Sequence, residues 1–214
     1  AAAYGTNGNG ITIKNAGTLT LSGYTNQNIG GIGFESAAGT LNVESSGTAT
    51  FTATNFPSNI DLLTLKTSST MSMTGAQIDT FGDDKITVNG GTLTVTSYNN
   101  QNLSNLTLTT DNSTDTVNVE AADNVTFDTG NLVPDKTSAI SLGSGITATM
   151  SAAHAVSYLG ATNAVSITVA SDATALNITG YTNQNFSSAN LTGNQKLAVT
   201  TADGADITNT ILHN

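Results

Sequence analysis

The chain has 214 residues and a net charge of −10, from 15 acidic residues against five basic ones, which are all lysines. Phosphate binding requires clustered Lys and Arg, so this balance argues against a nucleic acid partner and against an anionic membrane surface. Cys is absent, and no apolar run approaches the roughly 20 residues that a membrane-spanning helix needs.

Short segments of alternating polarity occupy the first third of the chain. Alternation with β-branched residues predicts strands, and the Gly, Asn and Ser between the segments predict turns. The segments are ITI at 11–13, TLTL at 18–21 and IGF at 32–34, followed by LNV from Leu41, TATF from Thr48 and LLTL from Leu62.

Two longer segments, 73–82 and 150–160, resemble each other and interrupt this strand pattern. Each has a potential helix N-cap, apolar residues at helical spacing and a glycine that would end a helix. We therefore expect one short helix in each insertion, packed on a face of the strands. The residues are Thr74, Ile78, Phe81 and Gly82 in the first, and Ser151, Val156, Leu159 and Gly160 in the second.

One phrase returns three times: LSGYTNQNI at 21–29, VTSYNNQNL at 95–103 and ITGYTNQNF at 178–186. A catalytic loop is needed once, whereas a unit that buries its apolar face against copies of itself must recur. The repetition therefore favours a stacked repeat protein.

A weaker pattern, an aromatic residue and then an Asn about four positions later, recurs at intervals that suggest a base period near 30 residues. An Asn at a corner can satisfy backbone groups and stack on the Asn of the next coil, while the aromatic fills the core. The rival interpretation is a polar ligand-binding ladder. The positions are Asn28, Asn59, Asn102, Asn131 and Asn185, preceded by Tyr24, Phe56, Tyr98, Phe127 and Tyr181.

These patterns predict an all-β fold, a parallel β-solenoid with coils of about 30 residues and three short strands per coil. We expect residues 1–214 to form a single β-solenoid domain, a fragment of a longer repetitive protein. Alternate strand positions should point inward, namely Leu19, Leu21, Phe51, Leu93, Val95, Leu106, Leu108, Val117, Val119, Phe127, Ile167 and Val169.

The sequence gives little support to catalysis. The two histidines are His154, expected on the surface of the second helix, and His213, and neither belongs to a recognisable arrangement with Ser and Asp. We expect no catalytic residue, no cofactor-binding residue and no enzyme activity.

Acidic clusters are the candidate metal ligands, because hard cations bind carboxylates in Gly- and Asn-rich turns. Neither an EF-hand loop nor the Gly-rich calcium nonapeptide is present. We predict calcium in inter-coil turns, with solvated turn residues as the alternative. The candidates are Asp83, Asp84, Asp111, Asp115, Asp203 and Asp206.

The Thr-rich strands such as GTLTVTSYNNQNL, the passage MSAAHAVSYLGATNAVSITV and the absence of Cys and Arg resemble the repeat regions of bacterial surface-layer proteins and of acidic adhesins exported by type I secretion. This resemblance implies an extracellular protein at the bacterial cell surface, and such families commonly bind calcium and assemble outside the cell.

Two functional hypotheses follow. The first is a structural, non-enzymatic segment, a surface-layer lattice element or stiff spacer, whose partners are copies of itself or neighbouring segments of the same protein. The second is an adhesin or ice-binding module that uses one solenoid face, with a cell-surface glycan as partner or with alternate threonines such as those at Thr18, Thr48 and Thr92 facing ice.

Overall fold

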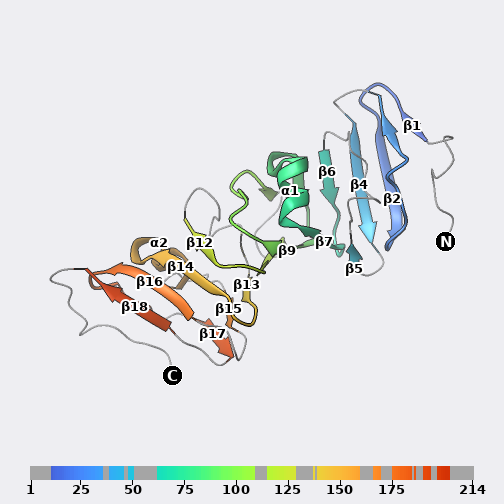
Figure 1. The fold of residues 1–214 in the computed structure, drawn as a ribbon. Coiled ribbons are helices and arrows are strands. Elements are labelled where there is room, and N and C mark those ends of the chain that lie inside the picture. Colours follow the sequence, from blue (N-terminus) through green and yellow to red (C-terminus); the bar gives the residue numbers. More distant parts are fainter. Residues whose placement is uncertain are drawn as a thin grey trace. The chain divides into compact units, whose positions relative to one another are not determined.

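The described residues form parallel β-structure with two short helices (Figure 1), which confirms the predicted all-β parallel β-solenoid class. The computed structural model describes residues 11–35, 39–45, 48–50, 62–108, 115–128, 137, 139–159, 166–169, 175–184, 186, 190–193 and 197–202. The chain divides into two compact units, residues 1–95 with 105–117, and residues 96–104 with 118–214.

The first unit is built around a five-stranded parallel sheet with the order β10-β8-β6-β4-β2. Its strands are β2 (Thr18–Tyr24), β4 (Thr40–Ser45), β6 (Leu62–Leu65), β8 (Ile86–Val88) and β10 (Thr107–Leu108). Two further parallel pairs accompany it: β1 (Thr12–Ile13) with β3 (Gly33–Phe34), and β5 (Thr48–Thr50) with β7 (Thr70–Thr74).

The second unit repeats this arrangement with other strands. One parallel sheet has the order β12-β14-β16-β18, and a second ladder joins β13 to β15 and β15 to β17. The strands are β12 (Val125–Phe127), β13 (Ala139–Leu142), β14 (Thr147–Ser151), β15 (Ser166–Val169), β16 (Ala175–Tyr181), β17 (Asn190–Gly193) and β18 (Leu197–Thr201). Two more strands, β9 (Thr92–Tyr98) and β11 (Thr116–Ala121), contribute residues to both units.

The strand register gives a shorter coil than the sequence suggested. Thr18 pairs with Thr40, and Thr40 pairs with Leu62, so these coils are 22 residues apart. Across the described pairs the separation ranges from 20 residues, between Thr87 and Thr107, to 28 residues, between Thr147 and Ala175. The expected period near 30 is approached only where β13 pairs with β15 and β14 pairs with β16, because it was measured between aromatic–Asn pairs, which do not mark every coil. Three described strands per coil occur only in places, as in β3-β4-β5, whereas β6 and β7 are the two described strands of the following coil.

Alternation along the strands places the apolar side chains inside, as predicted. Leu93, Val95, Leu106, Val117, Val119 and Phe127 are buried, whereas Leu19, Leu21 and Leu108 are half-buried. The position of Phe51 and the side chains of Ile167 and Val169 lie outside the described residues.

The first insertion forms the expected helix, α1 (Gly75–Phe81), and a 3₁₀ turn, η1 (Asp83–Lys85), follows it. Thr74 caps α1 in a capping box with Gln77. Gly82 ends the helix with φ of 96° and donates its N–H to the Ile78 carbonyl at 2.7 Å. The side chains of Ile78 and Phe81 are buried, and the Lys85 ammonium lies 5.9 Å from the centre of the Phe81 ring.

The second insertion forms α2 (Ala152–Leu159), where the Ser151 hydroxyl accepts the N–H of His154 at 3.2 Å. The predicted apolar face was wrong at Val156, which is exposed, because the helix instead buries Ala152, His154 and Ala155. Leu159 ends the helix, its side chain is not described, and Gly160 lies outside the described residues.

Among the described strands, the same kinds of element recur at intervals of seven strands. β2, β9 and β16 are the three seven-residue strands that end in the tyrosine of the recurring phrase, and they belong to three different sheets. β7 and β14, seven strands apart, are the two that lead into helices α1 and α2. The recurring phrase therefore marks a repeat longer than one coil.

Candidate functional site

The recurring phrase folds into the same turn in each of its three copies. The tyrosine side chain is buried and its hydroxyl donates to a backbone carbonyl three residues later, from Tyr24 to Gln27, from Tyr98 to Gln101 and from Tyr181 to Gln184, at 3.0, 3.0 and 3.1 Å. A buried phenol requires such a partner, and burial raises the pKa of Tyr24 to about 12. The predicted aromatic corner is confirmed at these positions.

The glutamine of the phrase closes the same turn from the solvent side. Its Oε1 accepts the backbone N–H of the residue after the tyrosine, Thr25, Asn99 or Thr182, at 2.8, 2.6 and 2.8 Å. In the first and third copies its Nε2 also donates to the hydroxyl of that threonine. These contacts within the turn explain why Gln recurs in all three copies, and no ligand is needed to explain it.

The residue before each tyrosine has a left-handed backbone: Gly23 has φ of 67°, Ser97 of 50° and Gly180 of 65°. In the first and third copies the ladder register shifts at this residue, as in a β-bulge. The bulge turns the chain so that the tyrosine enters the core.

A different Asn from the one predicted joins neighbouring coils. Asn26 Oδ1 accepts the N–H of Thr50 at 2.6 Å, 24 residues later, and Asn100 Oδ1 accepts that of Thr126 at 2.8 Å, 26 residues later. The predicted corner residues Asn28 and Asn102 instead accept the N–H two residues ahead within their own turn. Asn59, Asn131 and Asn185, together with Phe56, lie outside the described residues.

Two of the six candidate metal ligands hold backbone groups of another coil. Asp83 is buried, and its Oδ2 accepts the backbone N–H of Asn105 at 2.9 Å while its Oδ1 faces the Asn105 side-chain amide at 3.4 Å. Asp115 is also buried, and its Oδ1 accepts the backbone N–H of Gly90. Both carboxylates have a structural use, because they satisfy backbone donors at inter-coil turns.

The described structure does not gather the other four candidate acids into a cluster with Asp83 or Asp115. Asp84 is exposed, and Asp111, Asp203 and Asp206 lie outside the described residues. Among the residues that the structure describes, no group of three or more His, Asp or Glu side chains comes together. The calcium site therefore stays a prediction.

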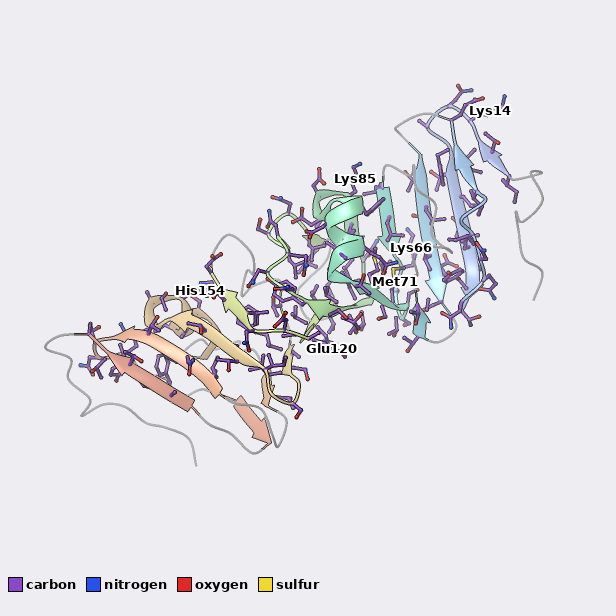
Figure 2. The ribbon with its side chains drawn as sticks, in the orientation of Figure 1. Lys14, Lys66, Met71, Lys85, Glu120 and His154 are labelled. Carbon is purple, nitrogen blue, oxygen red and sulfur yellow. The ribbon has the colours of Figure 1, made fainter. Side chains whose placement is uncertain are left out.

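His154 was expected at the surface, and this expectation was wrong. Its side chain is 6% exposed, on α2 (Figure 2). It occupies the third position after the cap Ser151, as Gln77 does after Thr74 in α1. Burial lowers the pKa of His154, and the Asp128 carboxylate opposes that shift. His213 lies outside the described residues.

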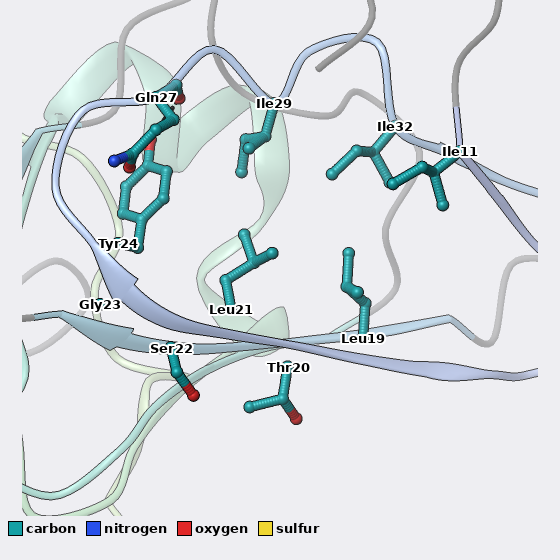
Figure 3. Close-up of a pocket in the computed structure, with 10 residues that line it drawn as sticks. All are labelled: Ile11, Leu19, Thr20, Leu21, Ser22, Gly23, Tyr24, Gln27, Ile29 and Ile32. Atoms are coloured by element: carbon teal, nitrogen blue, oxygen red, sulfur yellow. Dashed lines mark hydrogen bonds between the residues drawn. The ribbon is translucent and has the colours of Figure 1, made fainter. Parts of the chain in front are cut away.

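An apolar groove lies over β2, where the sequence pattern gave no signal for a site. Its volume is about 480 Å³. Leu19 and Leu21 point into it from the strand, Ile29 and Ile32 face them from the following turn, and Thr20 and Ser22 point away from it (Figure 3). Ile11, at its edge, is 42% exposed.

The described helices include none that is both long and apolar enough to cross a membrane. Comparison with known proteins gave no matching family model, no matching curated protein and no matching solved structure.

Proposed function

We propose that the chain is a structural, non-enzymatic segment of an exported bacterial cell-surface protein, acting as a stiff spacer or as part of a surface-layer lattice. The observation that carries the proposal is that polar side chains of the chain accept hydrogen bonds from backbone groups of neighbouring coils. Asp83 and Asp115, which sequence alone offers as metal ligands, each accept a backbone N–H from another coil. Asn26 and Asn100 do the same.

Stacked coils with such contacts suit a load-bearing role. Each coil contacts mainly its neighbours, so the structure extends by adding coils, and parallel ladders with satisfied turn groups resist bending and opening. The outward positions carry small neutral polar groups, as where Thr48 pairs with Thr70 and Thr50 with Ser72. Such a face suits close contact with copies of itself or with neighbouring segments.

The rival hypothesis is an ice-binding or adhesive face. A regular threonine array is the feature that ice binding would use, and one outward row of the second unit breaks it, since Thr126 pairs with Thr149, Thr149 with Asn177, and Asn177 with Ala198. This interruption favours the structural role over ice binding.

Electron microscopy of the full-length protein tests the proposal. We expect ordered arrays or rods of constant width on cells and in purified protein. A dispersed monomer that binds glycan on an array of oligosaccharides, or that shapes ice crystals, would contradict the structural role and favour the adhesive one.

A further inference from the structure

Two apolar side chains of the first described coil are less buried than their counterparts in the other two copies of the recurring phrase. Leu19 and Leu21 of β2 are half-buried. Their counterparts in the other copies of the phrase, Leu93 and Val95 of β9 and Leu176 and Ile178 of β16, are almost completely buried.

The difference lies in what packs beside each strand. β9 neighbours β7 and β16 neighbours β14, whereas β2 ends its sheet and, among the described strands, pairs with β4 alone. The groove of Figure 3 lies on the side of β2 that no described strand covers, and it includes the turn that follows β2. An apolar edge of this kind is a template for a further strand.

The two covered copies also show what covers them. In β14, Ala148 pairs with Leu176 and Met150 pairs with Ile178, and in β7 the inward residues are Met71 and Met73, both buried. Each covering strand is parallel in its sheet and continues into a helix capped by Thr74 or Ser151. α2 also contacts β16.

We propose that the groove over β2 receives a parallel strand and capped helix of the β7–α1 kind, from another repeat of the same protein. A methionine should lie opposite Leu21, as Met150 lies opposite Ile178, and Met or Ala opposite Leu19. Methionine suits this position because its flexible thioether fills an irregular apolar space. The docked strand would pair with the edge of β2 and bury Leu19 and Leu21.

The test uses a synthetic peptide with the sequence of residues 68–82 and the 214-residue protein. We expect saturable one-to-one binding by titration calorimetry, with hydrogen-exchange protection of the β2 amides. The control peptide carries Met71→Asp and Met73→Asp, and its affinity should be lower by a factor of about ten or more. Equal binding of both peptides, or no binding, would overturn the proposal.

Two protein variants locate the peptide. Leu21→Asp places a charge in the groove and should abolish binding, whereas Thr20→Asp, on the opposite side of β2 (Figure 3), should bind normally. If Leu21→Asp fails to fold, Leu21→Ser replaces it, and the protection of β2 in the unmodified protein remains decisive. Protection confined to another strand would overturn the assignment.

Sedimentation of the protein without peptide distinguishes a strand from another repeat from a second copy of this chain as the occupant of the groove. We expect a monomer, because β7 and β14 of a second copy are already paired on both sides. A concentration-dependent dimer that Leu21→Asp removes would assign the groove to a second copy and overturn the proposal. A docked strand would extend the solenoid whether or not the full-length protein forms arrays. Failure of the peptide to bind would therefore contradict this proposal alone, and failure to form arrays would contradict the proposed function alone.

Discussion

The carboxylate of Asp83 accepts the backbone N–H of Asn105, 22 residues further along the chain, at 2.9 Å. Asp83 follows α1, and Asn105 lies in the turn after the second copy of the recurring phrase. A residue that sequence alone offered as a metal ligand thus joins one coil to the next.

Asp83→Ala should lower the free energy of unfolding by about 1–3 kcal/mol, because a buried backbone donor loses a charged acceptor. The matched control is Asp84→Ala, whose side chain is exposed and whose loss should change stability by less than about 0.5 kcal/mol. Urea unfolding measures both. Equal effects of the two variants would contradict a structural role for Asp83.

Ser97→Gly should stabilise the protein by up to about 1 kcal/mol. Ser97 has φ of 50° where the other two copies of the phrase have glycine, and a side chain in this region costs about 1–2 kcal/mol, partly offset by the greater freedom of an unfolded glycine.

The reverse change, Gly180→Ser, should destabilise by a similar amount. A Cβ at Gly180 would meet no atom within 4 Å, so its cost comes from the backbone alone. Urea unfolding measures the midpoint of each variant. If the midpoints of Ser97→Gly and Gly180→Ser shifted in the same direction, the left-handed backbone at the bulge would not explain the preference for glycine.

His154 should make stability depend on pH. Its pKa is lowered from 6.5 by burial, so the unfolded chain binds the proton more readily than the folded one. The contribution of neutral His154 is therefore fully present above about pH 6.5 and is lost as the pH falls below that value toward the lower folded pKa.

His154→Gln isolates this contribution, because Gln77 holds the equivalent position in α1. The free energy of unfolding, measured at about pH 7.5 and about pH 5.5, should fall less in the variant than in the original protein. Identical changes in both proteins would exclude His154 as the source.

The calcium prediction is tested by thermal unfolding in chelator and then in millimolar calcium. An ion that binds only the folded state raises the melting temperature with the logarithm of its concentration. We expect such a rise, and Asp111→Asn or Asp203→Asn should reduce it if those acids are ligands. Superimposable curves would instead leave all six acids as turn residues.

Local patterns predicted the strands and helices well, because period-two alternation and capping residues act over a few neighbours. The predicted segments at 11–13, at 18–21 and from Thr48 contain the strands β1, β2 and β5, and Thr74 and Gly82 bound α1. The coil length was overestimated for most coils, because it depends on which strands pair. Among the described strands, the tyrosine phrase recurs every seven strands rather than every coil.

The candidate sites depended still more on pairing. No local signal distinguishes Asn26, which bonds across coils, from Asn28, which bonds within its own turn. The groove over β2 is a property of what lies beside the strand, since the inward residues of β9, whose sequence has the same alternation, are buried. Burial of His154 likewise follows from the way α2 packs rather than from its composition.

The central claim is that alternate strand residues hold stacked coils together while the intervening residues face outward. Val95→Asp compared with Thr94→Asp in urea unfolding tests it most directly, because Val95 is completely buried and its neighbour Thr94 is half-exposed on the same strand, β9. Val95→Asp should abolish the cooperative transition, since an unpaired charge would enter the apolar core, and Thr94→Asp should keep it. A cooperative transition of unchanged midpoint in Val95→Asp would contradict the account.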